Sequence, residues 1–129
     1  NMNIKNIEKN ADGSISSVVA TFDANATNFS KTKKCTWLAA TPDVVECTLV
    51  EFDHLITKPK LEDGDNFQDY VNPISRTETS ALCDPCLRNI NSGTTIQLER
   101  KGFFRVDKAY GGTGKPAVLF CIPDGKLKK

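Results

Sequence analysis

A segment of alternating apolar residues interrupted by one glycine, residues 96–107, limits the folds open to this chain more than any other feature. Ile96 and Leu98 share one parity before the glycine, and Phe104 and Val106 share one parity after it. Residues two apart in a strand lie on the same face, and glycine accepts a positive φ without a steric penalty. The pattern therefore predicts a β-hairpin that buries one face.

Three permanent cations, Arg100, Lys101 and Arg105, belong to the same segment and are predicted to cluster at its turn. A hairpin that buries one face and holds cations near its tip suits presentation of positive charge to a large anion. Two alternatives stay open at this point. The tip is simply solvated, or the cations pack within the protein and pair with Glu99 or Asp107.

Other short apolar runs predict further strands. Ile4–Glu8 and Ile15–Phe22 flank an Asp-Gly turn signal and should pair antiparallel. Glu46–Thr57 and Ala117–Ile122 are two more strands, the last of them central in its sheet. Aromatic residues at helical spacing predict a short helix that begins near Asp65. The fold class is mainly β with one or two short helices.

The densest basic cluster contains Lys31, Lys33 and Lys34 and lies in a predicted surface loop. Strand character is expected to resume over Cys35–Leu38, with the only tryptophan, Trp37, packed in the core because of its large apolar area.

Composition places limits on function. With 17 basic and 16 acidic residues the net charge is +1, so any affinity for nucleic acid must arise from local patches. The 129 residues contain no apolar run long enough for a membrane span, and the chain starts with asparagine, so we expect a soluble fragment of a longer protein. Five cysteines at irregular spacing indicate a reducing, cytoplasmic compartment rather than a disulfide framework.

The spacing Cys83-Asp84-Pro85-Cys86 is the one that suggests metal or redox chemistry. Zinc needs four ligands, and neither a second such pair nor paired histidines accompany it. A structural interpretation is simpler: Asp84 caps a short helix whose first residue is Pro85, and Cys86 and Leu87 pack inward. A small cysteine-based redox or metal-binding protein remains the alternative from another functional class.

No arrangement of residues predicts catalysis. His54, the only histidine, has no nearby acid, serine or cysteine at catalytic spacing and is interpreted as structural. The glycine-rich loop 111–114 lacks the Lys-Ser or Lys-Thr of a phosphate loop, and Pro116 stands where a helix would begin. We predict a binding module without catalytic residues, a metal site or a cofactor of its own.

Six segments, in the same order, resemble the C-terminal region of eukaryotic cytosolic glutamyl-tRNA synthetases. They are Thr36–Leu38, Leu49–Lys58, Val71–Pro73, Asp84–Arg88, Ile96–Phe104 and Ile122–Gly125. The resemblance extends from Ile4 to Lys126. Glutaminyl-tRNA synthetases share the Glu-Arg-x-Gly-Phe-type hairpin, whereas the second and sixth segments are more similar to the glutamyl branch.

The resemblance implies an anticodon-binding region made of two linked β-barrels, related in fold to a ribosomal protein. Residues 1–34 and 96–129 would form part of the proximal barrel, and residues 35–95 the distal barrel. The parent would be a cytoplasmic class I ligase that attaches glutamate to tRNA(Glu) with ATP and Mg²⁺. This chain alone would be inactive. Its partners would be the tRNA anticodon stem-loop, the rest of the synthetase chain and, for the parent, other synthetases in a complex, with no membrane.

The residues expected to contact tRNA follow from charge and from this resemblance. Lysine and arginine side chains neutralise phosphates, while bases of a loop are read by hydrogen bonds and stacking. Lys31, Lys33 and Lys34 are the first choice for backbone contacts, and Arg100, Lys101 and Arg105 are the second. Arg76 and Arg88 are weaker candidates. Glutaminyl relatives carry an arginine where this chain has Val50, so no base-reading residue is assigned there. A general RNA-binding barrel, from a glutaminyl-tRNA synthetase or a ribosomal-type protein, is the alternative.

Overall fold

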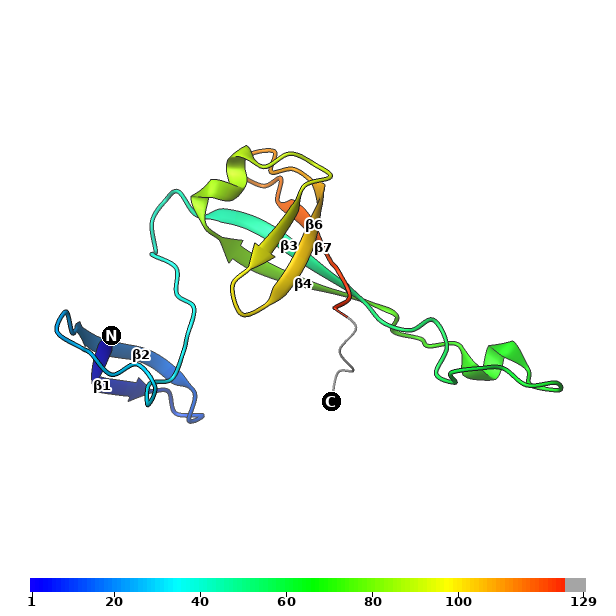
Figure 1. Ribbon diagram of the computed structural model, residues 1–129, viewed down its shortest axis with the longest axis horizontal. Coiled ribbons are helices and arrows are strands. Elements are labelled where there is room, and N and C mark those ends of the chain that lie inside the picture. The colour runs from blue at the N-terminus through cyan, green and yellow to red at the C-terminus, as the bar shows by residue number, and fades with distance from the viewer. Residues whose placement is uncertain (125–129) are drawn as a thin grey trace. The chain divides into compact units, whose positions relative to one another are not determined.

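The structure is a computed structural model that describes residues 1–124. The chain consists of two compact units, with the boundary between Cys35 and Thr36. Strands dominate both units, which confirms the mainly β prediction (Figure 1). The elements are β1 (Met2–Lys9), β2 (Ile15–Phe22), β3 (Val45–Phe52), the 3-10 helix η1 (Phe67–Tyr70), β4 (Arg76–Cys83), the 3-10 helix η2 (Pro85–Asn89), β5 (Thr95–Leu98), β6 (Gly102–Lys108) and β7 (Ala117–Cys121).

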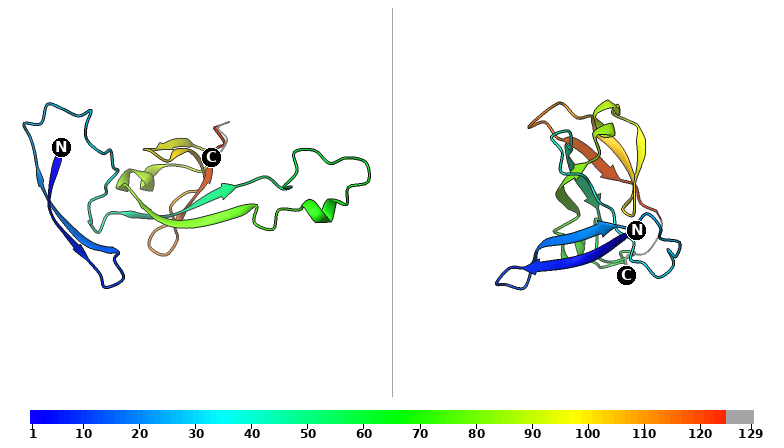
Figure 2. Two further views of the ribbon diagram at one scale, coloured as in Figure 1. Left: turned by 90° about the horizontal axis from the view of Figure 1, so that it is seen from below. Right: turned by 90° about the vertical axis from the view of Figure 1, so that its left-hand side faces the viewer.

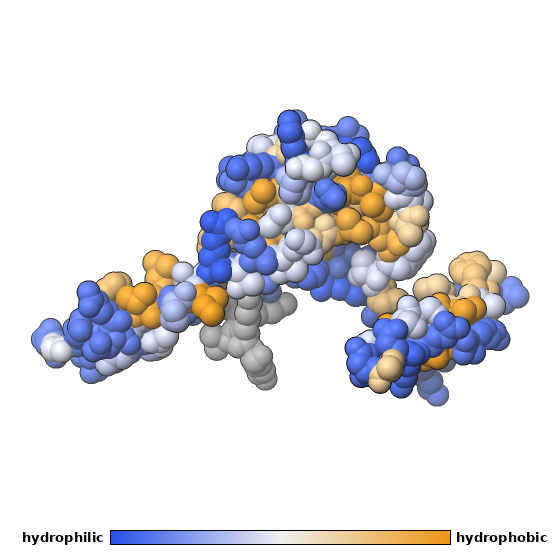
Figure 3. All heavy atoms as spheres, turned by 180° about the vertical axis from the view of Figure 1, so that it is seen from behind, coloured by the Kyte–Doolittle hydropathy of each residue, from blue (hydrophilic) through white to orange (hydrophobic). Residues whose placement is uncertain are grey.

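The first unit contains the antiparallel hairpin β1–β2, which confirms the predicted pairing. Its turn forms because Asp12 accepts a hydrogen bond from the Ser14 amide at 2.9 Å while Gly13 adopts a φ of 83°. All residues of both strands are exposed, and apolar residues are visible on the surface of this unit (Figure 3). The large exposed apolar side chains of these two strands are Met2, Ile4, Ile7, Ile15, Val18, Val19 and Phe22.

The second unit is organised around a five-stranded sheet with the order β4-β3-β7-β6-β5 (Figures 1 and 2). Central β7 runs parallel to β3 and antiparallel to β6, so the predicted central position of Ala117–Ile122 is confirmed. The predicted hairpin is also confirmed, since Ile96 lies opposite Phe104 across β5 and β6. Within the described residues β4 and β5 are edge strands, and closure into barrels stays a prediction.

One face of this sheet carries the hydrophobic core. Leu49, Leu119 and Val106 lie side by side across β3, β7 and β6, and all are at most 4% exposed. Helix η2 adds Leu87, also buried, and its N-cap Asp84 accepts a hydrogen bond from the Cys86 amide at 2.9 Å. The predicted cap is therefore confirmed. The prediction that Cys86 packs inward was wrong, because its side chain leaves the short helix on the exposed side.

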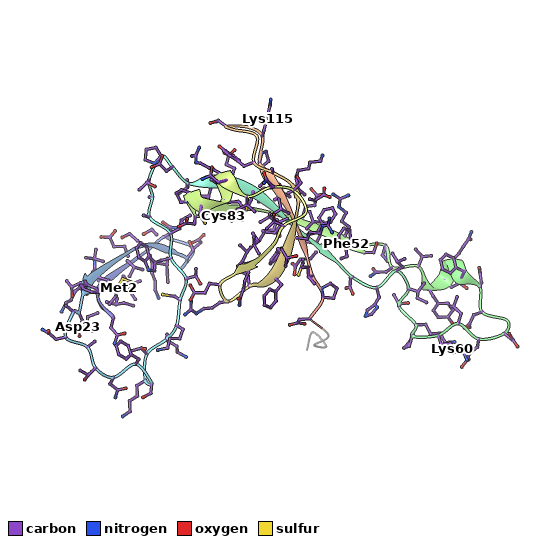
Figure 4. The ribbon with its side chains drawn as sticks, turned by 45° about the horizontal axis from the view of Figure 1, so that its top comes forward. Met2, Asp23, Phe52, Lys60, Cys83 and Lys115 are labelled. Atoms are coloured by element: carbon purple, nitrogen blue, oxygen red, sulfur yellow. The ribbon has the colours of Figure 1, made fainter. Side chains whose placement is uncertain are left out.

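Residues 53–75 form an arm that extends from the ends of β3 and β4; Figure 4 labels Phe52 at its base and Lys60 within it. The predicted strand over Glu46–Thr57 is shorter in the structure because β3 ends at Phe52, and pairing continues only at the isolated bridge Ile56–Val71. Helix η1 follows its N-cap Asn66, close to the predicted start.

A small polar cluster holds the arm together. Lys58 Nζ lies 2.7 Å from Asp65 Oδ2 and 5.2 Å from the Tyr70 ring centroid, and the Tyr70 hydroxyl donates to Asp65 Oδ1 at 3.2 Å. Glu62 N also donates to Asp65 Oδ2, at 2.7 Å. The bond from Lys58 is the main cause that lowers the pKa of Asp65 below its ordinary value.

Two predictions for Cys35–Leu38 were wrong. The segment has no strand structure, and Trp37 is 72% exposed rather than buried. This segment is not part of a sheet, so no neighbouring strand covers the Trp37 indole. The large apolar area of the side chain therefore does not lead to its burial.

The division into residues 1–34, 35–95 and 96–129 stays a prediction, and the compact units are described separately from it. The first unit ends at Cys35, but residues on both sides of position 95/96 share one sheet because β3 pairs with β4 and with β7. Residues 125–129 of the last segment lie outside the described residues. Assignment of either unit to a proximal or distal barrel stays a prediction.

Candidate nucleic-acid interface

The basic loop of the first unit presents its lysines unequally. Lys31, Lys33 and Lys34 are all exposed. The Lys34 ammonium, however, donates to the Phe29 carbonyl and, at 2.7 Å, to the Thr32 hydroxyl. Lys34 therefore serves to close the loop, and Lys31 and Lys33 are the better placed cations for a ligand.

Arg100 occupies the turn between β5 and β6 in a left-handed conformation, with a φ of 61°. The Lys101 amide donates to the Leu98 carbonyl at 3.0 Å, which closes a four-residue turn whose third position normally favours glycine. Arg100 Nη1 lies 2.5 Å from Glu99 Oε1 and donates to Thr36 Oγ1 at 3.3 Å. The pairing with Glu99 weighed from the sequence is thus present, and it offsets part of the positive charge at the tip.

Arg105 does not belong to the basic tip, contrary to the prediction. It lies opposite Thr95, at the end of the hairpin away from the turn, because Phe103 and Phe104 of β6 separate it from Gly102. A Cβ atom on Gly93 would lie 3.5 Å from its Nη2 atom, so the guanidinium extends over that turn.

Arg105 instead lies on the face of the five-stranded sheet opposite the core, here called the outer face. Its cross-strand neighbour on β7 is Phe120, whose neighbour on β3 is Val50, and Val50 lies opposite Glu78 on β4. The Phe120 ring contacts Phe52 edge to face with a centroid distance of 5.2 Å. Aromatic and apolar side chains therefore extend continuously across three strands.

Two further exposed side chains share the outer face. Phe103 lies two residues from Arg105 on β6 and is 49% exposed. Arg76 lies opposite Phe52 and forms an ion pair with Glu78. Arg76 and Arg105 thus share the outer face but lie on strands separated by β3 and β7, whereas Arg100 and Lys101 lie at the turn of the hairpin. The lysine loop belongs to the other unit.

Sequence reasoning missed the aromatic residues of this face. Their signal was present, because adjacent residues of a strand point to opposite faces and only one of Phe103 and Phe104 can enter the core. Arg88, the weaker candidate, is structural: its Nη2 donates to the Asp43 carbonyl at 2.9 Å and its guanidinium lies 5.3 Å from the Tyr110 ring centroid.

Other kinds of site find little support in the part of the chain that the structure describes. Across residues 1–124, His, Cys, Asp and Glu side chains do not gather in groups of three that could hold a metal ion. Among residues 1–124 the helices are too short to cross a bilayer.

A mainly β domain whose outer sheet face combines exposed aromatic rings with arginine has the features of a module for single-stranded nucleic acid. The chain belongs to the family described as tRNA synthetases class I (E and Q), anti-codon binding domain, whose sequence model matches residues 34–107. This family assignment confirms the resemblance found in the sequence.

Named relatives point to one branch of the family. The chain is similar to a cytoplasmic glutamate–tRNA ligase of Arabidopsis thaliana, with 44% identity over 98% of the chain and 18% of the relative. It is 48% identical to the cytoplasmic glutamate–tRNA ligase of Saccharomyces cerevisiae over 92% of the chain and 16% of the relative. A bifunctional glutamate/proline–tRNA ligase of Cricetulus griseus is 41% identical over the whole chain and 9% of its own length. The chain thus spans less than a fifth of each relative.

Proposed function

We propose that this chain binds the anticodon stem-loop of tRNA(Glu) as part of a cytoplasmic glutamate–tRNA ligase. The observation that carries the proposal is the similarity to ligases named for glutamate across at least 92% of the chain, in a family described as anticodon-binding. The outer face, with Phe103 and Arg105, supplies the kind of side chains that unpaired bases stack on.

The two kinds of candidate residue would act differently. Lys31 and Lys33 would neutralise backbone phosphates and fix the register of the RNA without reading its sequence. Phe103, Phe52 and Arg105 would stack on splayed bases, a contact that tolerates several bases. Arg100 and Lys101 would contact phosphates only weakly, because Glu99 lies against Arg100.

The parent enzyme would attach glutamate to tRNA(Glu) with ATP and Mg²⁺, and the catalytic groups would come from parts of that enzyme outside this chain. The remainder of the synthetase would be the covalent partner. One relative is named a bifunctional glutamate/proline–tRNA ligase. This name supports a parent protein that combines two ligases, or one that associates with other synthetases. The proximal and distal barrels would then be completed within the parent.

Fluorescence anisotropy with a labelled tRNA(Glu) anticodon stem-loop tests the proposal. The chain should bind this stem-loop more tightly than one with a substituted anticodon, measured at a single stated salt concentration. Equal affinities would support the alternative of a general RNA-binding module. Undetectable binding of both RNAs would contradict an RNA interface in this chain.

A further inference from the structure

Cys47 and Cys83 bring their sulfur atoms within 3.2 Å of each other. They lie on adjacent antiparallel strands as diagonal neighbours, since Val45 is opposite Cys83 and Cys47 is opposite Ala81. The pair differs from the Cys83–Cys86 spacing noted in the sequence. Cys86 is exposed on η2, and its amide is held by the Asp84 carboxylate. The fold therefore selects a partner for Cys83 that is distant in sequence.

We propose that Cys47 and Cys83 form a dithiol site that a low-molecular-weight disulfide, of the glutathione class, oxidises to an intramolecular disulfide bond. A disulfide bond requires the two sulfur atoms to approach to about 2.05 Å, which is about 1 Å closer than the observed separation. Cys83 is the last residue of β4, and β4 is an edge strand held by β3 alone among the described strands. This shift therefore disturbs only one strand pair.

The two thiols have different surroundings. Cys47 is 2% exposed and packs in the core, whereas Cys83 is only partly buried at its margin. Cys83 offers a small molecule the more accessible sulfur, because it is only partly buried and lies at the end of an edge strand. The hydrogen bond between the two sulfur atoms lowers the pKa of Cys83, and the same bond together with burial raises the pKa of Cys47. Cys83 is thus the thiol that reacts first.

The exchange is balanced in two steps. The Cys83 thiolate attacks one sulfur of the small disulfide, forms a mixed disulfide and releases one small thiolate. Cys47 then loses its proton and attacks the Cys83 sulfur, which forms the Cys47–Cys83 bond and releases the second thiolate. The two protein thiols lose two electrons, the small disulfide gains them, and the two thiol protons end on the released thiols. Because Cys47 must ionise, closure should accelerate as pH rises.

The bond would connect β3 to β4 directly at the strands from which the arm extends. It would close a loop that contains all of residues 53–75, which restricts the unfolded chain. The site would not change the proposed tRNA function. It would couple the stability of the five-stranded sheet to the thiol–disulfide balance of the surroundings.

The test incubates the chain with oxidised glutathione, alkylates the remaining thiols in denaturant and maps unreduced peptides by mass spectrometry. Two of the five thiols should become protected, and one peptide pair should join Cys47 to Cys83. Cys86→Ser, the matched control, should retain this link, while Cys83→Ser should abolish it and leave Cys47 alkylated. The oxidised chain should melt about 5 °C or more above the reduced chain.

Two outcomes would overturn the proposal. One is a link between Cys83 and Cys86, which would mean that sequence proximity and not the fold selects the partner. The other is glutathione that persists on Cys83 while Cys47 stays fully alkylated, which would mean that the core does not release Cys47. Because Cys83 is only partly buried, Cys83→Ser should fold, and its circular dichroism spectrum provides the check.

Discussion

Phe103 and Phe104 are neighbours in β6 with opposite environments. Phe104 is 2% exposed and belongs to the core, whereas Phe103 is 49% exposed on the outer face beside Arg105. Leaving half of a phenyl ring in water forgoes part of the free energy that its burial would supply. Such a residue is therefore more informative about binding than its buried neighbour.

Phe103→Ala should weaken binding of the tRNA(Glu) stem-loop by roughly 5- to 150-fold, since one base–aromatic stack contributes about 1–3 kcal/mol. Phe67→Ala is the matched control, because Phe67 is 54% exposed but lies on η1 in the arm. Anisotropy titrations of both variants provide the measurement. Equal losses in the two variants would remove the outer face from the interface.

Within the described residues, Arg100 is the residue other than glycine that has a positive φ, 61°. Arg100→Gly removes a steric penalty of about 1–2 kcal/mol, whereas Lys101→Gly mainly adds unfolded-state entropy. The exposed ion pair with Glu99 contributes little to stability. Urea unfolding should therefore give Arg100→Gly a free energy of unfolding about 1–2 kcal/mol above that of Lys101→Gly. The reverse order would show that the left-handed turn is not adopted in solution.

At the scale of elements, the basic loop and the arm differ in what their charges do. In the loop, Lys34 closes the backbone while Lys31 and Lys33 face solvent. In the arm, Lys58 is already bound to Asp65 and Glu62. A cation that an internal carboxylate already holds is a poorer phosphate ligand, so the loop is the better candidate for RNA backbone contacts.

Reversing both exposed lysines of the loop, Lys31→Glu with Lys33→Glu, should weaken stem-loop binding and flatten its salt dependence. Each lost phosphate contact lowers the slope of log K against log salt by roughly one. A titration series across salt concentrations measures the slope. Lys60→Glu, an exposed position in the arm, is the control and should leave the slope unchanged. An unaltered slope in the double variant would exclude the loop from the interface.

Asp65 makes the arm sensitive to acid. Its carboxylate accepts bonds from Lys58, Glu62 and Tyr70, and its pKa is lowered, so the stabilisation is present above the unfolded-state pKa of about 3.9. It is lost as pH falls through the lower folded-state pKa. The NMR shift of the Glu62 amide should report this titration below pH 4. Lys58→Gln should move the midpoint upward toward the ordinary value, and an unmoved midpoint would contradict the role of Lys58.

The elements were predictable where a local pattern determines them. The alternation in β6, the Asp-Gly turn before Ser14 and the Asp84 cap each need only neighbouring residues, and all three are found. The end of β3 at Phe52 was missed because Leu55 and Ile56 resume strand-forming residues after Asp53 and His54, whereas in the structure only an isolated bridge at Ile56 follows. The prediction that Trp37 is buried was wrong for a related reason, since burial depends on which side chains pack against the indole.

The charged residues of the candidate site could be predicted from the sequence, but the surface on which they lie could not. Lysines and arginines are visible in the sequence, but the sheet face on which each one lies is not. Arg76 and Arg105 share the outer face only because β3 and β7 join their strands into one sheet. Likewise, the contact between Cys47 and Cys83 depends on the register of β3 against β4. Pairings between distant segments are set by the tertiary fold, and no local pattern of residues records them.

At the scale of the whole molecule, the two units differ in whether they contain a hydrophobic core that could support independent folding. The core residues Val45, Leu87, Val106 and Leu119 all lie within the second unit. The first unit has a two-stranded hairpin whose strands are exposed throughout, and such a hairpin is at best marginally stable in water.

Residues 36–129 expressed alone should therefore fold cooperatively, with an NMR spectrum matching that of the second unit in the full chain. Amide hydrogens of β1 and β2 in the full chain should exchange far faster than those of β3 and β7, because exchange follows local stability. Hydrogen exchange read by NMR measures both. Unfolding of the shortened chain would mean that the first unit contributes to the stability of the sheet.

The parallel contact between β3 and β7 also imposes an order on biosynthesis. β3 is made early, but Leu49 meets its neighbour Leu119 only after β4, η2, β5 and β6 have been synthesised. Before β7 is synthesised, the strand edge of β3 that pairs with β7 is unpaired. The central strand that links β3 to β6 is also missing. Folding of this domain on the ribosome must therefore be late, and the completed core cannot form before Cys121 has left the exit tunnel.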